Sequence, residues 1–239
     1  MMLSGKRVLA VVPARGGSKG VQLKNLRPIN GTPLVALVGD VVRRLSCIDR
    51  AIVSTDHPKI AAAAREAGLD VPFMRPASLS GDIVSDWDVL NHALLACEKL
   101  DNTRYDIVVM LQPTSPFRKP EHVSATISKL IDGGYDAVWT VSQTDSKAHP
   151  IKQLVVDGDK LEYYDKASGA GIIARQQLQP VYHRNGVAYA ITRDCIIGQG
   201  NIKGEKTSFV LIDDLLANID TELDFTWAEF LLQAGIARI

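Results

Sequence analysis

The chain has 239 residues, 46% of them hydrophobic, and its 27 basic side chains balance its 27 acidic ones. This length suits one sizeable α/β domain, and the charge balance argues against a nucleic acid or a membrane surface as partner. Residues 1–6 are too few for a signal peptide and no apolar run is long enough to span a membrane, so we expect a cytoplasmic protein. The three cysteines lie far apart without metal-ligand spacing, which agrees with a reducing compartment.

Apolar runs and amphipathic segments alternate along the first part of the chain. The expected elements, in order, are strand 8–12, helix 32–45, strand 51–54, helix 58–67, strand 71–74, helix 86–100, strand 107–111, helix 120–131 and strand 136–141. Strands that alternate with helices predict an α/β fold with a Rossmann-like, mostly parallel sheet and helices on both of its faces.

The alternation stops after residue 141. Segment 142–186 is polar, and it contains two prolines and a turn signal at Asp157-Gly158. A structureless loop of this length is not expected inside a compact domain, so we predict an inserted lobe with a hairpin around 153–163. The main domain then comprises 1–141 and 187–239, and it is completed by strands 187–191 and 209–212 and by helix 221–234.

A glycine-rich, basic segment, PARGGSKGVQLKN at 13–25, directly follows the first strand. It interleaves three glycines with three cations: Gly16, Gly17, Gly20, Arg15, Lys19 and Lys24. Glycine allows positive φ and close approach of the backbone to a ligand, and free amides beside cations favour an anion. The spacing is neither GxxxxGK[ST] nor GxGxxG. It predicts a different polyphosphate-binding loop, with a plain glycine-rich turn bearing solvated cations as the alternative.

Three further polar segments are expected beyond the carboxyl ends of strands, where open α/β sheets bind ligands. They are residues 54–56, 112–118 and 218–220. The turn at 112–116 offers the amide of Gln112 and the hydroxyls of Thr114 and Ser115 for hydrogen bonding. An ordinary strand-to-helix turn capped by Thr114 or Ser115 explains the same residues equally well.

Several of these motifs together resemble the CMP-sialic acid synthetases, also called acylneuraminate cytidylyltransferases. The similar stretches are PARGGSKG with LKN at 13–25, STD at 54–56, RPASLSGD at 75–82, LQPTSPFR at 111–118 and NIDTELDF at 218–225. They follow the order of the family and cover nearly the whole chain. The resemblance implies transfer of CMP from CTP to the anomeric hydroxyl of a nonulosonic (sialic-type) acid, with release of pyrophosphate.

The resemblance also implies roles for individual residues. The expected catalytic residues are Arg15, Lys24 and Asp220. The expected nucleotide-binding residues are Gly16, Gly17, Ser18, Lys19, Asn25, Arg75 and Ser85. The expected sugar-binding residues are Gln112, Thr114, Ser115, Arg175 and Arg184. The second family arginine usually stands one place earlier, at His183, so that either His183 or Arg184 takes its role.

Two positions depart from the family's usual pattern. Asp86 stands where the family often has Ser, and it is alternatively the N-cap of its helix. Asn218 stands where many members have the first of two Asp residues that hold Mg²⁺. We expect Asn218 and Asp220 to lie on one face at a strand end and to hold Mg²⁺ with one negative charge fewer. Alternatively this segment only caps the next helix, with Thr221 as N-cap and Asp224 at N3; both interpretations are compatible.

The resemblance implies, further, that 142–186 is a dimerisation lobe and that the protein is a homodimer. Legionaminic, pseudaminic and Kdo-like acids remain open as substrates, although Kdo synthetases usually have an Asp-containing turn where this chain has residues 112–114. The change to Asn218 also leaves open a non-catalytic nucleotide-binding protein.

Overall fold

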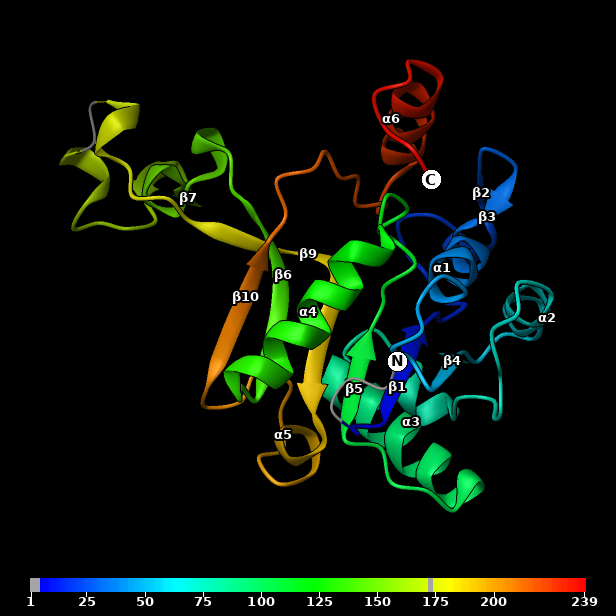
Figure 1. Ribbon diagram of the computed structural model, residues 1–239. Coiled ribbons are helices and arrows are strands. Elements are labelled where there is room, and N and C mark those ends of the chain that lie inside the picture. Colours follow the sequence, from blue (N-terminus) through cyan, green and yellow to red (C-terminus); the bar gives the residue numbers. More distant parts are fainter. Residues whose placement is uncertain (1–4, 172–173) are drawn as a thin grey trace. The chain divides into compact units, whose positions relative to one another are not determined.

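The computed structural model describes residues 5–171 and 174–239, and within them the central element is a six-stranded sheet in the order β10-β6-β9-β5-β1-β4 (Figure 1). Its strands are β1 (Val8–Pro13), β4 (Arg50–Ser54), β5 (Ile107–Met110), β6 (Ala137–Gln143), β9 (Tyr182–Thr192) and β10 (Thr207–Leu211). Strand β1 pairs in parallel with β4 and with β5, whereas β9 runs antiparallel to β5.

Helices cover both faces of this sheet. One core cluster joins α1 (Leu34–Val42), α2 (Pro58–Glu66) and α4 (Pro120–Gly133), and another joins α3 (Asp86–Asp101) and α5 (Arg193–Ile197). In β1, Val8, Ala10 and Val12 face the first cluster, and Leu9 and Val11 face the second. All five are fully buried, as a strand between two helical layers requires. The predicted α/β fold is confirmed.

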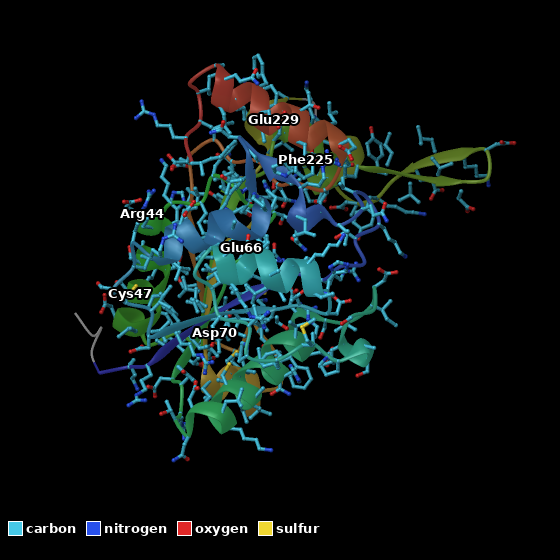
Figure 2. The ribbon with its side chains drawn as sticks, turned by 90° about the vertical axis from the view of Figure 1, so that its right-hand side faces the viewer. Arg44, Cys47, Glu66, Asp70, Phe225 and Glu229 are labelled. Atoms are coloured by element: carbon cyan, nitrogen blue, oxygen red, sulfur yellow. The ribbon has the colours of Figure 1, made fainter. Side chains whose placement is uncertain are left out.

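A third cluster joins the closing helix α6 (Glu222–Gln233) to Ile29 of β2 (Pro28–Ile29) and to the start of α1; β2 forms a small hairpin with β3 (Thr32–Pro33). On α6, Phe225, Ala228 and Leu231 recur at helical spacing and are buried there (Figure 2 shows Phe225). The Arg27 guanidinium lies 4.9 Å from the centroid of the Phe225 ring and pairs with Glu222. Ala217 and Ile219 are buried in the same cluster, so this packing also fixes the segment that precedes α6.

The chain divides into two compact units. The first contains the residues up to Thr140 together with Asn185–Val210 and Asp214–Ile239, and the second contains Val141–Arg184 and Leu211–Asp213. In the second unit β7 (Leu154–Asp157) and β8 (Lys160–Tyr163) form the antiparallel hairpin expected around 153–163. Every residue of the two strands is exposed.

Several expected elements differ in the structure, and three of them illustrate why. No strand forms at 71–74: Asp70 makes a single bridge with Ile52, and the next residue but one, Pro72, has no backbone donor to continue a ladder. Helix α1 starts at Leu34, because Thr32 and Pro33 belong to β3. Strand β9 starts at Tyr182, five residues before the expected start. No helix in the described part of the chain is long and apolar enough to cross a membrane.

Candidate active site

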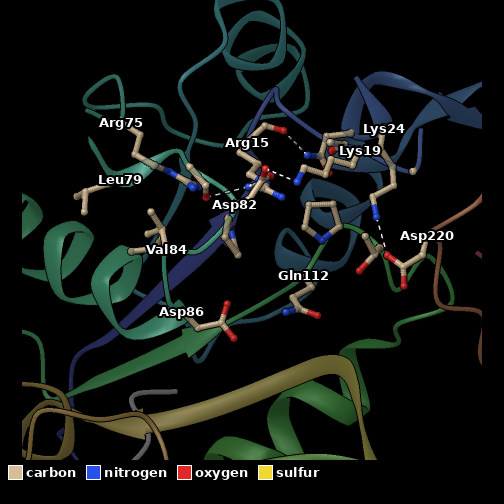
Figure 3. A pocket seen from close by; sticks show the side chains of 18 of the residues that line it. Arg15, Lys19, Lys24, Arg75, Leu79, Asp82, Val84, Asp86, Gln112 and Asp220 are labelled. Carbon is tan, nitrogen blue, oxygen red and sulfur yellow. Dashed lines mark hydrogen bonds and ion pairs between the residues drawn. The ribbon is translucent and has the colours of Figure 1, made fainter. Parts of the chain in front are cut away.

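A cavity of about 620 Å³ lies beyond the carboxyl ends of β1 and β5 in the first unit (Figure 3). Segments from four parts of the chain line it: the glycine-rich loop, residues 75–89, the turn after β5, and the segment before α6. Of the expected site residues, its lining contains Arg15, Ser18, Lys19, Lys24, Asn25, Arg75, Gln112, Thr114, Asn218 and Asp220. The structure therefore brings together residues that lie up to about 200 positions apart in the sequence.

Two polar contacts shape the glycine-rich loop. The Gly16 amide donates to Asp56 Oδ1 at 2.8 Å, and Asn25 Nδ2 donates to the Arg15 carbonyl oxygen at 3.0 Å. Asn25 is buried, so its hydrogen bond to Arg15 is shielded from water and holds the loop backbone in place. The expected residue Asp56, in the STD motif, thus supports the loop from the end of β4.

Gly16 and Gly20 are needed for space rather than for positive φ, which corrects the expectation from the sequence. None of Gly16, Gly17 and Gly20 has a positive φ. A Cβ at Gly16 would meet the His57 side chain, and a Cβ at Gly20 would fall onto the backbone carbonyl oxygen of Asp220. The loop and the segment before α6 therefore approach each other as closely as backbone permits at Gly20.

Gly20→Ala should lower the free energy of unfolding by about 1–3 kcal/mol, because the new methyl group must push two backbone segments apart. Gly17→Ala is the matched control, since a Cβ there meets nothing within 4 Å. Urea unfolding of the two variants measures the difference. Equal stabilities would show that the close approach at Gly20 is unimportant.

Each of the three loop cations is paired with a carboxylate. Arg15 Nη1 lies 3.0 Å from Asp82 Oδ1 and donates to the Gly81 carbonyl oxygen at 2.8 Å, and Lys19 Nζ lies 2.7 Å from Asp82 Oδ2. Lys24 Nζ donates to Asp220 Oδ1 and to the Ile219 carbonyl oxygen, both at 2.7 Å. The hydrogen bond from Lys19 is the main cause that holds the pKa of Asp82 below its usual range.

Asp82 is a pocket residue that the sequence analysis missed. It belongs to the RPASLSGD motif at 75–82, of which only Arg75 was expected to bind the nucleotide. The available signal was a carboxylate next to a glycine, Gly81, in a motif expected at the same site as three cations.

Arg75 is buried, and its backbone and side chain tie it to the end of β4. Its amide donates to the Thr55 carbonyl oxygen at 2.7 Å, and Nε donates to Ser54 Oγ at 3.0 Å. Burial lowers the pKa of Arg75 to about 10, and the neighbouring Asp56 opposes that shift. Arg75 remains a cation at neutral pH and adds positive charge to the cavity wall.

The turn after β5 is held by Arg118. This buried guanidinium donates to the backbone carbonyl oxygens of Gln112, Gly186 and Val187. Burial lowers the pKa of Arg118 to about 9. Gly186 has a φ of 72°, which other residues rarely adopt, and a Cβ there would meet the Gln112 side chain. Both the backbone conformation and the lack of space therefore require glycine. The turn is therefore a fixed wall of the cavity.

Two expected ligand-binding hydroxyls have structural partners instead of lining the cavity. Ser115 Oγ donates to the Asn185 carbonyl oxygen at 2.9 Å, and Ser115 is buried. Ser85 is the N-cap of α3, where its hydroxyl accepts from the Asp88 amide at 3.2 Å. The idea that Asp86 is the N-cap is therefore wrong: Asp86 is the first residue of α3 and lines the cavity.

The segment with Asn218 and Asp220 does not follow a strand directly, because β10 ends at Leu211 and 212–219 is irregular. Its two polar side chains still meet, and Asn218 Nδ2 donates to Asp220 Oδ2 at 2.8 Å. The expected capping box is confirmed: Thr221 accepts from the Asp224 amide, and Asp224 Oδ2 accepts from the Thr221 amide at 2.7 Å.

The donor set suits a metal ion that arrives with phosphate better than one held by the protein alone. Among the described residues there is no group of three or more His, Cys, Asp or Glu side chains placed to bind a metal. The cavity offers the Asp220 carboxylate and the Asn218 amide side by side. Mg²⁺ commonly binds through one or two carboxylates together with substrate phosphates and waters, so these two residues fit such an ion.

Two expected sugar-binding residues belong to the second unit. Arg184 is an exposed residue of β9. Arg175 begins the short 3₁₀ turn Arg175–Gln177, and its side chain lies outside the described atoms. Neither is among the described residues that line the cavity.

A sequence model of the cytidylyltransferase family matches residues 9–226. The chain belongs to this family. It is 32% identical to a CMP-N,N'-diacetyllegionaminic acid synthase of Legionella pneumophila, with 93% of this chain and 94% of the relative covered. It is 27% identical to an N-acylneuraminate cytidylyltransferase of Escherichia coli O18:K1:H7, with 93% of this chain and 51% of the relative covered. The resemblance to the CMP-sialic acid synthetases is thereby confirmed.

The fold of this cytidylyltransferase also has a counterpart among solved structures. A CMP-2-keto-3-deoxy-manno-octonic acid synthetase complexed with CTP superimposes with a TM-score of 0.69 and 18% identity, covering 96% of this chain and 100% of that one. At this identity the likeness shows a shared nucleotidyltransferase fold.

Proposed function

We propose that this cytidylyltransferase transfers CMP from CTP to the anomeric hydroxyl of a nonulosonic acid and releases pyrophosphate. The observation that carries the proposal is the cavity itself, which is lined by the cations of the glycine-rich loop together with Arg75 and Asp220. The three cations of the loop suit a triphosphate, and a rigid turn with Gln112 and Thr114 suits the hydroxyl and amide groups of a sugar acid.

The reaction needs positioning and charge neutralisation more than a strong base. The oxygen of the anomeric hydroxyl attacks the α-phosphorus in line and its proton passes to solvent. The bond from this phosphorus to the oxygen that bridges to the β-phosphate breaks, and pyrophosphate carries away that electron pair. Arg15, Lys19 and Lys24 would stabilise the negative charge that moves onto the leaving group. Asn25 holds the loop in shape through the Arg15 carbonyl oxygen, and its side-chain oxygen is the group we assign to the nucleotide.

We assign Mg²⁺ as the cofactor, held by Asp220 and Asn218 together with the phosphates. When bound, such an ion supplies charge stabilisation to the phosphate oxygens. Binding of the ion would use the Asp220 oxygen that now accepts from Lys24, and Lys24 would then be left to the phosphates. Asn218 already lies beside Asp220, so the pair needs no large rearrangement.

We also propose a homodimer with 142–186 as the dimerisation lobe, because the hairpin of this segment exposes apolar side chains on both strands. Leu154, Val156, Leu161 and Tyr163 are each at least 41% exposed. Light scattering at micromolar protein should give the mass of a dimer, and Val156→Asp with Leu161→Asp should shift it toward the monomer. A wild-type monomer with full activity would contradict the dimer, and Arg175 and Arg184 would lose support as residues of a shared site.

The function is tested by measuring pyrophosphate release from CTP and Mg²⁺ with a panel of acids: N-acetylneuraminic, N,N'-diacetyllegionaminic, pseudaminic and 2-keto-3-deoxy-manno-octonic acid. We expect turnover with at least one nine-carbon acid and little with the eight-carbon acid. Tight CTP binding without turnover on any acid would favour a nucleotide-binding protein without catalytic activity.

A further inference from the structure

Asp82 makes an ion pair with each of two loop cations from a distant part of the sequence. It lies between the 3₁₀ turn Ala77–Leu79 and helix α3, and it reaches Arg15 and Lys19 on the loop after β1 (Figure 3). A third contact, from Arg15 Nη1 to the Gly81 carbonyl oxygen, ties the backbone next to Asp82 to the same loop. The 80–84 segment is thus fastened to the loop at the site where the proposed function places phosphates.

A carboxylate and a phosphate compete for the same donors. Both present anionic oxygens that accept charge-assisted hydrogen bonds from guanidinium and ammonium groups. Asp82 uses one oxygen for Arg15 and the other for Lys19, so both of its oxygens are engaged. A triphosphate that takes these two cations must therefore displace Asp82 or share them with it at a cost in repulsion.

The exposure of the partners makes such an exchange easy. Lys19 is 78% exposed and Asp82 is 42% exposed, so water reaches the pair and its net strength is small. Lys24 differs, because its side chain is only 14% exposed and it also donates to the Ile219 carbonyl oxygen. The contacts of Asp82 are the ones that a ligand can replace most readily.

We propose that Asp82 is an internal competitor of phosphate: it occupies Arg15 and Lys19 in the empty site, yields them to the triphosphate, and takes them back as pyrophosphate leaves. The inference rests on the proposed function, because it assigns these two cations to CTP and pyrophosphate. It makes Asp82 a residue that weakens ground-state binding of both and speeds product release. A purely structural tie would instead lose stability on removal of the charge and gain no affinity.

The test uses tripolyphosphate, which carries the phosphate chain without base, sugar or metal ion. Isothermal titration of the full chain should show that Asp82→Asn lowers the Kd of tripolyphosphate by about 3- to 10-fold, the scale of two partly exposed ion pairs. Asp82→Glu keeps a carboxylate and should stay near wild type. Asp132→Asn makes the same change in net charge at an exposed residue of α4 outside the cavity lining, and it should also leave the Kd unchanged.

The inference would be overturned if Asp82→Asn left the Kd of tripolyphosphate unchanged or raised it. It would also be overturned if Asp132→Asn lowered this Kd as much as Asp82→Asn does. A second measurement checks product release: pyrophosphate should inhibit Asp82→Asn more strongly than wild type, by a similar factor. Failure of the proposed function gives a different result, because wild type would then show no turnover on any acid whatever the tripolyphosphate titrations give.

Discussion

Lys24→Ala is expected to lower kcat/KM for CTP by about 100-fold or more, the scale of losing one preorganised charge partner of the transition state. Lys24 is the least exposed of the loop lysines, and its ammonium is fixed between the Ile219 carbonyl oxygen and Asp220. The Ile219 carbonyl oxygen would still hold this cation when Asp220 turns to the metal ion, so little reorganisation is needed as charge develops on the leaving group. Steady-state kinetics with saturating sugar acid measures the loss.

Two controls accompany this variant. Lys19→Ala removes a far more exposed cation and should cost much less, and Lys59→Ala removes an exposed lysine of α2 outside the cavity lining and should cost nothing. Melting curves show whether the loop and α6 remain packed in each. Near-normal turnover of Lys24→Ala with CTP would contradict the assignment of this loop to the triphosphate.

Asp220→Asn is expected to reduce turnover by about 100-fold or more while the protein stays folded, because it removes the one anionic side chain we assign to Mg²⁺. The amide of residue 220 would still donate to Asp224, so the start of α6 should be preserved. Magnesium titrations of activity, beside melting curves, separate loss of the metal ligand from loss of structure. Wild-type turnover at unchanged Mg²⁺ dependence would show that the metal assignment is wrong.

Two neighbouring variants distinguish the metal role from the capping role. Asn218→Asp restores a second negative charge and should lower the half-saturating Mg²⁺ concentration. Thr221→Ala removes the confirmed N-cap and should lower stability by about 1 kcal/mol with little effect on turnover. If capping were the whole purpose of this segment, the Mg²⁺ dependence would be the same in all of these variants.

The parts of the fold that the sequence predicted well are those where hydrophobic periodicity decides. Strands β1 and β5 are buried on both faces, so their sequences are continuous apolar runs with little ambiguity. The misplaced strand at 71–74 had the same kind of apolar residues, but Pro72 and the pairing of the Arg75 backbone with Thr55 direct that segment elsewhere. Hydrogen bonds between distant segments, such as this one, cannot be predicted from the local pattern of apolar residues.

The candidate site was predictable at the level of segments and less so at the level of side chains. Strand order brings the loop after β1 and the turn after β5 together, which follows from topology alone. Which hydroxyl faces the cavity depends on its partners: Ser115 is satisfied by the Asn185 carbonyl oxygen and Ser85 by its own helix. Asp82 was missed because its two cations lie more than 60 residues away, and only the folded chain shows that contact.

The most direct test of the account follows the phosphates of CTP. The protein is incubated with Mg²⁺, a nonulosonic acid that supports turnover, and CTP radiolabelled at either the α- or the γ-phosphate. We predict that the α-label moves into a CMP–sugar adduct and that the γ-label appears in pyrophosphate, in equal amounts. An α-label that stays in CTP, or that appears as free CMP without any sugar adduct, would contradict the transfer of CMP to a sugar acid by this protein.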